Sequence, residues 1–298
     1  MTFNSLEPLE FIKQSHNKLI IDVRSPLEYL KGHIPDAVNI PLFSDKERKD
    51  VGTIYKKTGK KEAVLKGLLY VQPKLHSFVR QIYDLVCDDQ NQQIFVYCHR
   101  GGMRSQSFSW LLHTSGFNVQ RLDSGYKSFR RLVLETFERK IHFVILGGKT
   151  GCGKTDILKE LEKKGEQVLD LEKIACHKGS AFGDLGQDIQ PSPQQFENNL
   201  FKNIFDFDFN KPVWIENESP GIGGLFIPVG IRKNMKNAPL INIDLPVKER
   251  IKRITKEYGN FESCLLEERI NKIKRKLGSD NLKRAIFNLY NDQLEETI

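Results

Sequence analysis

Short apolar runs alternate with amphipathic stretches along the first half of the chain. The apolar runs have the length and the flanking turn residues of buried strands, at Lys18–Val23, Ala37–Ile40, Gln93–Tyr97 and Val119–Leu122. Helical spacing is found at Pro26–Leu30, at Glu62–Val86 with an interruption at Pro73, and at Ser105–Ser115. This alternation predicts an α/β domain with a largely parallel sheet.

The same alternation starts again in the second half, after a charged amphipathic helix predicted at Phe129–Arg139. Further strands are predicted at Ile141–Leu146, Gln167–Leu171, Val213–Glu216 and Leu240–Leu245, and a further helix at Lys154–Lys164. Residues 175–193 are rich in Gly, Ser, Asp and Pro and have no clear period, so we expect a long loop there. From Lys248 onward the chain reads as helical and basic.

A length of 298 residues fits two domains. We predict a first α/β domain over residues 5–135. A second domain, a parallel α/β domain of the P-loop NTPase type with a basic helical C-terminal region, is predicted over residues 136–298.

Composition and charge narrow the class of protein. Hydrophobic residues make up 39% and charged residues 28%, as in ordinary globular domains. The net charge of +8 favours a polyanionic partner such as nucleic acid, although a merely basic soluble protein shows the same value. The five cysteines include no CxxC pair, which argues against a disulfide framework and a structural zinc site. With no signal peptide and no membrane-length apolar run, a cytoplasmic protein without a membrane partner is expected.

One cysteine stands at the end of a predicted strand and is followed by a loop rich in glycine and arginine. The segment is Cys98-His99-Arg100-Gly101-Gly102-Met103-Arg104-Ser105. Loop amides and the start of the next helix can converge above the sulfur, and Arg100 or Arg104 adds positive charge. These features favour the thiolate, which is the nucleophile, and a cradle for an oxyanion. The alternative, a buried structural cysteine before a chance turn, fits poorly with two glycines and two arginines in six residues.

Two flanking motifs give this loop a family context. Residues 22–29 (DVRSPLEY) with 32–41 (GHIPDAVNIP), and residues 122–130 (LDSGYKSFR), resemble the amino- and carboxy-terminal signatures of rhodanese domains. The resemblance covers about residues 5–135 and implies that Cys98 is the active-site cysteine, while Asp22 and Arg24 are structural. Ordinary sulfurtransferase loops place arginine five residues after the cysteine, whereas here Met103 holds that place and Arg104 comes sixth. The longer loop is typical of rhodanese-related phosphatases and favours a phosphate-bearing donor.

A second phosphate-binding motif opens the second domain. The segment Gly148-Lys149-Thr150-Gly151-Cys152-Gly153-Lys154-Thr155 matches G-x-x-x-x-G-K-[ST], the P-loop or Walker A motif, between a predicted strand and helix. Its amides can cradle a diphosphate, Lys154 supplies a charge, and a Mg²⁺ ion, if one is used, would be held by Thr155. The motif leaves ATP, GTP and other diphosphates open as ligands.

Two more segments belong to the predicted P-loop site. An acidic partner is expected at the end of the strand Val213–Glu216, with Glu216 or Glu218 as candidates. The predicted loop contains Cys176 and His177, for which a metal site or a second nucleophile is an alternative. We favour a substrate loop over the P-loop, with Ser180, Phe182 and Gly183 as candidate contacts.

Taken together, the motifs and their order resemble the tRNA 2-selenouridine synthase family over nearly the whole chain. The matching segments are the Cys98 loop and residues 147–155 (GGKTGCGKT), 170–172 (DLE), 177–183 (HKGSAFG) and 215–219 (IENES). The resemblance implies a transferase with geranyltransferase and selenotransferase activities. Geranyl diphosphate first alkylates the sulfur of 2-thiouridine at the tRNA wobble position, and selenium from selenophosphate then replaces that sulfur. The P-loop would seat the prenyl diphosphate, and Cys98 would carry selenium as a perselenide.

The same resemblance implies the partners. They are a tRNA that carries 2-thiouridine and an enzyme that supplies selenophosphate, with no tightly bound cofactor. A basic surface for the RNA phosphates is predicted on the C-terminal helices, at Lys248, Arg250, Lys252, Arg253, Lys256, Lys272, Lys274, Arg275, Lys276, Lys283 and Arg284. A solvated helix face is the alternative, because glutamates interleave with these cations.

Three other functions remain open from the residues alone. The first is a rhodanese-type sulfurtransferase coupled to an ATPase module, which needs Cys98 but no prenyl donor. The second is a phosphatase fused to a kinase, and the third is a scaffold that binds tRNA without catalysis.

Overall fold

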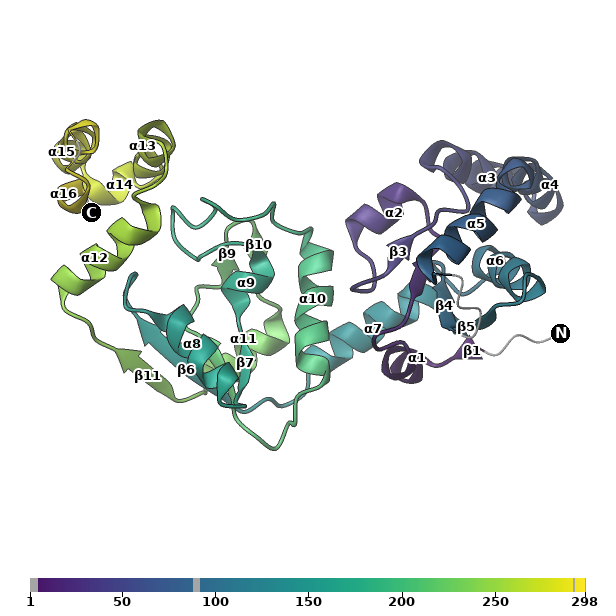
Figure 1. Cartoon of the computed structure of the whole chain (residues 1–298), viewed down its shortest axis with the longest axis horizontal. Coiled ribbons are helices and arrows are strands. Elements are labelled where there is room, and N and C mark those ends of the chain that lie inside the picture. Colours follow the sequence, from purple (N-terminus) through teal and green to yellow (C-terminus); the bar gives the residue numbers. More distant parts are fainter. Residues whose placement is uncertain (1–4, 88–91, 292, 298) are drawn as a thin grey trace. The chain divides into compact units, whose positions relative to one another are not determined.

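The computed structural model describes residues 5–87, 92–291 and 293–297 (Figure 1). The chain forms two compact units, Met1–Thr136 and Phe137–Ile298, here called the N-terminal and C-terminal units. Each unit is built on its own parallel sheet, so the predicted fold class is confirmed.

The sheet of the N-terminal unit has five parallel strands in the order β1-β5-β4-β2-β3. Their bounds are β1 Ser5–Leu6, β2 Ile20–Asp22, β3 Val38–Asn39, β4 Gln93–Tyr97 and β5 Asn118–Leu122. The central strand β4 is buried from Ile94 to Tyr97, as its continuous apolar run predicts. Because all five strands are parallel, their carboxyl ends lie at one edge, where Cys98 follows Tyr97.

Helices and one short 3₁₀ turn connect these strands. They are α1 Pro8–Gln14, α2 Pro26–Lys31, α3 Asp45–Lys57, α4 Lys60–Val71, η1 Gln72–Lys74, α5 Leu75–Leu85, α6 Met103–Thr114 and α7 Gly125–Phe137. The predicted interruption at Pro73 is confirmed, since η1 separates α4 from α5 there. Helix α3 was not predicted, because none of its residues is buried and its charged sequence lacks an apolar period. It begins with a capping box in which Ser44 and Glu47 bond each other's backbone amides.

The core of the N-terminal unit fixes the helix that follows Cys98. Phe108 and Leu112 of α6 pack with Phe78 and Ile82 of α5, and the Phe78 and Phe108 rings meet edge to face at 5.5 Å. Burying a side chain of this size contributes about 1.5–3 kcal/mol. The start of α6, and with it the loop before it, is therefore held on a rigid layer.

The C-terminal unit has a four-stranded parallel sheet in the order β11-β6-β8-β7 and a two-stranded hairpin. The strands are β6 Phe143–Gly148, β7 Gln167–Leu169, β8 Val213–Glu216 and β11 Leu240–Ile243, and the hairpin is β9 Gly221–Ile222 with β10 Leu225–Phe226. The helices are α8 Lys154–Lys163, α9 Leu171–Ala175, α10 Pro193–Phe205, α11 Val229–Lys236, α12 Val247–Tyr258, α13 Ser263–Lys272, α14 Lys274–Leu277, α15 Ser279–Tyr290 and α16 Leu294–Thr297. Helix α8 packs on β6, β7 and β8.

The C-terminal helices gather around a second small core (Figure 1). Its buried side chains come from α12, α13 and α15 and include Tyr258, Leu266 and Leu289. Leu185 and Phe182, from the predicted loop 175–193, also belong to this core. The segment after Ala175 is indeed a loop without regular structure up to α10, but its middle is anchored on the C-terminal helices.

Several element bounds differ from the predictions, and three of these differences lie next to the candidate sites. Helix α6 begins at Met103 instead of Ser105, because Gly102 takes the extended N-cap conformation, so Arg104 lies inside the first helical turn. Helix α7 begins at Gly125, four residues early. Strand β7 ends at Leu169, because the Asp170 side chain accepts the backbone N–H of Lys173 and starts α9. None of the described helices is long and apolar enough to span a bilayer.

Candidate functional sites

Cys98 lies at the carboxyl end of β4, with only 3% of the residue exposed. Its Sγ is 3.2 Å from Oγ of Ser105, in the first turns of α6, and 3.9 Å from the carbonyl oxygen of Gly102. The sulfur thus sits beneath the N-terminus of a twelve-residue helix, where positive potential favours an anion. The sequence predicted this position.

The backbone of the Cys98 loop is clamped onto the start of α7. The N–H of Tyr126 donates to the carbonyl of Cys98 at 2.8 Å, and the N–H of Lys127 donates to that of His99 at 3.0 Å. Gly125 has φ +61°, and a Cβ there would collide with the Cys98 carbonyl and the Gly101 amide. The glycine of the LDSGYKSFR motif is required by this close approach, not by the chemistry of the sulfur.

Asp22 and Arg24 form a buried pair next to this clamp, as the structural role expected for them requires. The Arg24 guanidinium donates to both Asp22 carboxylate oxygens and to the Gly32 carbonyl, and it lies 3.8 Å from the ring centroid of Tyr126. One side chain therefore ties together the DVR, GHIP and SGY segments around β4.

The charged residues of the Cys98 loop have different surroundings. Arg100 is exposed, as is Met103, while His99 is half-buried. Arg104 donates from its two terminal nitrogens to the Glu28 carboxylate at 2.6 and 3.2 Å. Arg104 is thus fixed by a partner from α2 that the sequence did not predict.

Glu28 also faces a second cation. The Nε of Arg48, on α3, lies 3.7 Å from Glu28 Oε2, and it is buried without a hydrogen-bond partner among the described residues. Burial alone would raise the pKa of Glu28, but the hydrogen bond and charge of Arg104, with Arg48, lower it to about 2. The single negative charge of Glu28 therefore offsets only one of the two arginine charges, and a net positive charge remains beside Cys98. Arg48 lies in a helix that carries no motif, so no sequence signal could have identified it.

The P-loop connects β6 to α8 as predicted. Gly151 and Gly153 have φ of +80° and +88°, and the Lys154 side chain folds back so that Nζ donates to the Gly148 carbonyl at 3.3 Å. Cys152 is buried, with 4% of the residue exposed, so it belongs to the loop's packing. Thr155 follows in the first turn of α8.

Helix α12 covers the P-loop, although it comes 100 residues later in the chain. Arg250 Nε donates to the Thr150 carbonyl at 2.9 Å, and Arg253 forms an ion pair with Asp156 at 2.9 Å. A Cβ on Gly153 would lie 2.8 Å from a terminal nitrogen of Arg253. Two arginines from the predicted basic region are thus P-loop neighbours.

Three glutamates lie near the P-loop, and the charge of Lys154 acts on two of them, Glu172 and Glu218. Glu216, at the end of β8 next to β6, accepts the N–H of Leu171, while its other carboxylate oxygen is buried without a partner among the described residues. Burial, together with the charge of Asp170, raises the pKa of Glu216 to about 9. Burial and the charge of Glu218 raise the pKa of Glu172 to about 7, and burial also raises that of Glu218, while Lys154 lowers both. Glu172, in the DLE motif, was not among the predicted site residues.

The predicted substrate loop reaches this acidic group. A Cβ on Gly179 would touch the Glu218 carboxylate, and Gly183 packs against the His177 ring. The amide of Phe182 donates to Ser180 Oγ at 3.2 Å, and the Phe182 ring lies 5.7 Å from that of Tyr258 on α12. The loop therefore links the glutamates to the C-terminal helices. No group of three His, Cys, Asp or Glu in the described ranges is arranged to hold a metal ion.

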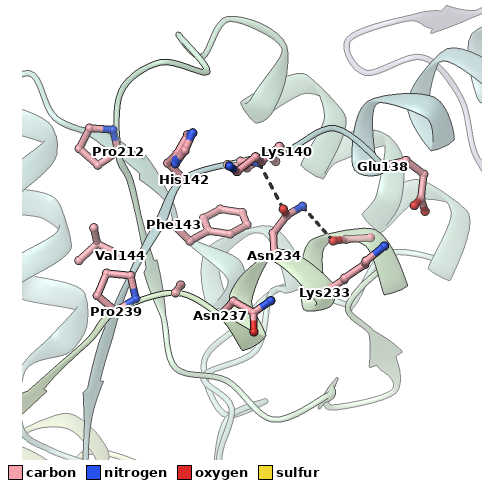
Figure 2. Close-up of a pocket in the computed structure, with 13 residues that line it drawn as sticks. Glu138, Lys140, His142, Phe143, Val144, Pro212, Lys233, Asn234, Asn237 and Pro239 are labelled. Atoms are coloured by element: carbon pink, nitrogen blue, oxygen red, sulfur yellow. Dashed lines mark hydrogen bonds between the residues drawn. The ribbon is translucent and has the colours of Figure 1, made fainter.

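A separate cavity of about 520 Å³ lies at the start of β6 (Figure 2). Figure 2 shows Asn234 of α11 bridging toward the chain near Lys140, where it accepts the Ile141 N–H at 3.4 Å and donates to Gly230. Ligands of parallel sheets bind at the carboxyl ends of the strands, where the P-loop lies. This cavity is at the opposite edge and contains none of the predicted site residues.

Comparison with known proteins gives the same assignment along almost the whole chain. Residues 141–296 match the family model described as the tRNA 2-selenouridine synthase AAA domain, and residues 7–132 match the rhodanese-like domain. The tRNA 2-selenouridine synthase of Pseudomonas putida (strain GB-1) is 32% identical over 283 residues, covering 91% of this chain and 74% of that protein.

Two further relatives carry the same name. The tRNA 2-selenouridine synthase of Sulfurovum sp. (strain NBC37-1) is 32% identical over 306 residues, covering 94% of this chain and 81% of that protein. The protein of that name from Bordetella bronchiseptica (strain ATCC BAA-588 / NCTC 13252 / RB50) is 34% identical over 288 residues, covering 89% and 77%.

Proposed function

The chain belongs to the tRNA 2-selenouridine synthase family, and from this premise we propose that it exchanges the sulfur of wobble 2-thiouridine in tRNA for selenium. It acts as a cytoplasmic transferase with geranyl diphosphate and selenophosphate as co-substrates. The observation that carries the proposal is the presence of two glycine-rich loops, each between a parallel strand and a helix, with different side chains around them. One holds the nucleophilic Cys98, and the other holds Lys154 and a group of protonatable glutamates.

The P-loop serves the first step. The sulfur of 2-thiouridine attacks C1 of the geranyl group, the C–O bond breaks, and diphosphate leaves. The loop amides, Lys154 and the neighbouring Arg253 are placed to bind the charge on the leaving diphosphate. Where Mg²⁺ takes part, Thr155 would hold it, and it would add charge compensation for the diphosphate.

The alkylation also releases a proton from N3 of the base. The charge of Lys154 acts on both Glu172 and Glu218, burial raises the pKa of both, and the Glu172 carboxyl group, with a pKa of about 7, can accept a proton at neutral pH. These glutamates are therefore the candidate proton acceptors of the first step.

The Cys98 loop serves the second step. Selenium of selenophosphate attacks C2 of the S-geranyl base, the C2–S bond breaks, and the proton of the selenol passes to the leaving sulfur, so that geranylthiol is released. The helix N-terminus and the cations Arg48 and Arg104 suit the phosphate group of this donor. Alkylation in the first step makes the sulfur a better leaving group, which gives a chemical reason for two sites in one chain.

The tRNA is held in part by the basic C-terminal helices. Lys274, Arg275 and Lys276 on α14 are exposed or half-exposed, and none pairs with a carboxylate of the described residues. Consecutive cations without such a partner are suited to bind RNA phosphates, because their binding releases counterions from the RNA.

The test is mass spectrometry of the wobble nucleoside after incubation of thiolated tRNA with the full chain. Geranyl diphosphate alone should give the S-geranyl nucleoside, and later addition of selenophosphate should give 2-selenouridine. A chain that transfers sulfur or hydrolyses ATP but adds no geranyl group would be the sulfurtransferase with an ATPase module, and the proposal would be wrong.

A further inference from the structure

The selenation step leaves one bond for which no residue has yet been assigned. If selenium attacks C2 while it still carries phosphate, the first product on the RNA is a Se-phosphoryl base, and the Se–P bond must then break. The assignment of a residue to that cleavage rests on the proposed function. The question is which group accepts the phosphoryl unit.

The Cys98 loop has the parts of a phosphoryl-transfer site. Arg104 stands six residues after Cys98 in the first turn of α6, and Ser105 follows with its Oγ 3.2 Å from the sulfur. Both Cys98 and Ser105 are buried, the latter with 0% exposed. A hydroxyl at this distance can donate to a thiolate, which stabilises the sulfur as nucleophile and later as leaving group.

Two arginines are placed to bind the phosphoryl oxygens. Arg104 and Arg48 come from α6 and α3 and converge on the single carboxylate of Glu28, with N–O distances of 2.6 and 3.7 Å. The Nε of Arg48 is buried and lacks a hydrogen-bond partner among the described residues. Arg48 also lies close enough to Cys98 for a thiolate there to interact with its charge. Glu28 is thus a positioning residue for a two-arginine anion site.

We propose that Cys98 is a phosphoryl acceptor, with Arg48 and Arg104 as the phosphoryl-binding residues and Ser105 as the hydroxyl donor to the sulfur. The Cys98 thiolate attacks phosphorus of the Se-phosphoryl base and the P–Se bond breaks. Its electron pair stays on selenium, which releases 2-selenouridine as an anion that takes a proton from water. Water then attacks phosphorus of the S-phosphocysteine, the P–S bond breaks, and orthophosphate leaves while the thiolate is restored.

When Cys98 attacks phosphorus, the atoms and electrons of the reaction balance. They do not balance with phosphate as the product when Cys98 takes selenium from selenophosphate to form a perselenide. Selenium in selenophosphate is already fully reduced. A thiolate that takes it from phosphorus as a perselenide must leave the bonding electron pair on phosphorus, so the other product is phosphite, not phosphate. Attack on phosphorus needs no further oxidant or reductant.

The ionisable side chains around the Cys98 loop also suit a leaving group that departs as a stable anion. Glu28 is ionised at neutral pH, because Arg104 and Arg48 hold its pKa low against the effect of burial. Burial lowers the pKa of His99, so that side chain is neutral there. Neither neighbour is suited to protonate a leaving group, but a 2-selenouracil anion is delocalised over its ring and leaves without protonation. The site should therefore cleave only phosphates whose leaving group is a stable anion.

The direct test is single turnover of the full chain with S-geranyl tRNA and selenophosphate, with acid quench and mass spectrometry of protein and RNA. We expect a phosphoryl adduct on Cys98 without the isotope pattern of selenium. Cys98→Ala should still release geranylthiol and should accumulate the Se-phosphoryl nucleoside. An adduct with the selenium pattern, or an alanine variant that releases no geranylthiol, would overturn the proposal.

A second measurement does not depend on tRNA chemistry. Dinitrophenyl phosphate should be hydrolysed by the wild type but not by Cys98→Ala, while phenyl phosphate, a poorer leaving group, should be cleaved at least roughly a hundredfold more slowly. Ser105→Ala should make the phosphocysteine adduct accumulate, since the thiolate leaves less readily. Equal rates on the two phosphates, or no hydrolysis of either, would refute the assigned role.

The arginine assignment has its own matched control. Inorganic phosphate should slow alkylation of Cys98 by iodoacetamide, and Arg48→Gln should weaken this protection roughly ten- to hundredfold. Arg80 is an exposed arginine on α5 that forms an ion pair with Asp84, and Arg80→Gln should behave like the wild type. Equal protection in both variants would exclude Arg48 from the site. Failure of the proposed function has another sign, namely wild-type protein that makes no 2-selenouridine while still hydrolysing the aryl phosphate.

Discussion

The two glycine-rich loops of this chain are alike in backbone, but folding shifts the pKa values of their neighbouring carboxyl groups in opposite directions. Each follows a buried parallel strand, turns through glycines with positive φ, and opens a helix. Around Cys98, two arginines share Glu28, and after the opposing effect of burial they lower its pKa to about 2. Around Lys154, burial raises the pKa of Glu172 to about 7 and that of Glu216 to about 9.

The contrast fits the two kinds of chemistry that we propose for the two loops. The first site keeps an unbalanced positive charge beside a nucleophile, so it is suited to an anion whose own phosphorus or selenium reacts. At the second site Glu216, with a pKa of about 9, stays protonated at neutral pH and does not cancel the charge of Lys154, whereas Glu172, with a pKa of about 7, is partly ionised and can accept a proton. Each of the following changes should affect one site and spare the other.

The largest effect is expected from Gly125→Ala in the clamp of the Cys98 loop. Its Cβ would collide with backbone atoms of Cys98 and Gly101 that cannot move independently, in addition to about 1–2 kcal/mol for a left-handed alanine. Gly165→Ala is the control, since its φ is +84° but nothing lies within 4 Å of the new Cβ. Denaturant unfolding should show a loss of several kcal/mol for the first and about 1 kcal/mol for the second. Equal losses would mean that the clamp does not hold the loop.

A smaller effect on stability should distinguish Glu28 at the first site from Glu216 at the second. Glu28→Gln removes the carboxylate shared by two partly buried arginines, so we expect a loss of about 1–3 kcal/mol in the free energy of unfolding. Glu216→Gln replaces a carboxyl group that is already neutral near pH 7, and it should cost less than about 1 kcal/mol. Chemical unfolding at pH 7 measures both losses. A larger loss for Glu216→Gln than for Glu28→Gln would contradict the difference between the two sites.

The pH dependence of stability should have opposite signs in the two units. Glu28 has its pKa lowered by folding, so its stabilisation is present above about 4.5 and is lost as pH falls toward 2. Folding raises the pKa values of Glu172 and Glu216, so the stabilisation from these two groups is present below about pH 4.5. It is lost as pH rises through about 7 for Glu172 and about 9 for Glu216. The slope is at most about 1.4 kcal/mol per pH unit for each group.

Each unit contains one tryptophan, which allows the two trends to be measured separately. Trp110 lies on α6 and Trp214 on β8. Fluorescence-detected unfolding of Trp214→Phe should follow the N-terminal unit and that of Trp110→Phe the C-terminal unit. Stability that rises and falls with pH in parallel for both reporters would contradict the pKa assignments.

The smallest effect is expected on tRNA affinity. Replacing Lys274, Arg275 and Lys276 together by glutamine should reduce the slope of log K against log salt by about 2, at roughly 0.7–0.9 per lost phosphate contact. A triple glutamine variant of the exposed Lys56, Lys57 and Lys61 in the N-terminal unit is the matched control. A larger change in that control would place the RNA contacts on the other unit.

The sequence predicted both loops because each is a local motif. Strand end, glycines and helix start are adjacent in the chain, so the positions of Cys98 and Lys154 follow from short-range patterns. Helix α3, by contrast, has no apolar period, and it escaped prediction together with Arg48, which it carries.

The partners of both loops depend on packing between distant segments. Glu28 is 76 residues from Arg104, and Arg250 is 100 residues from Thr150. Such pairings depend on how whole helices pack, and no spacing rule along the chain encodes them. The same is true of the glutamate pKa values, which depend on burial created by three separate segments.

We expect the two loops to divide the reaction between them, and nucleoside mass spectrometry after reaction with each co-substrate distinguishes their tasks. With geranyl diphosphate, Lys154→Ala should yield no S-geranyl nucleoside, while Cys98→Ala should yield as much as the wild type. With S-geranyl tRNA and selenophosphate, Lys154→Ala should form 2-selenouridine and Cys98→Ala should not. If a folded Cys98→Ala variant fails to geranylate tRNA, the two loops do not divide the reaction in this way.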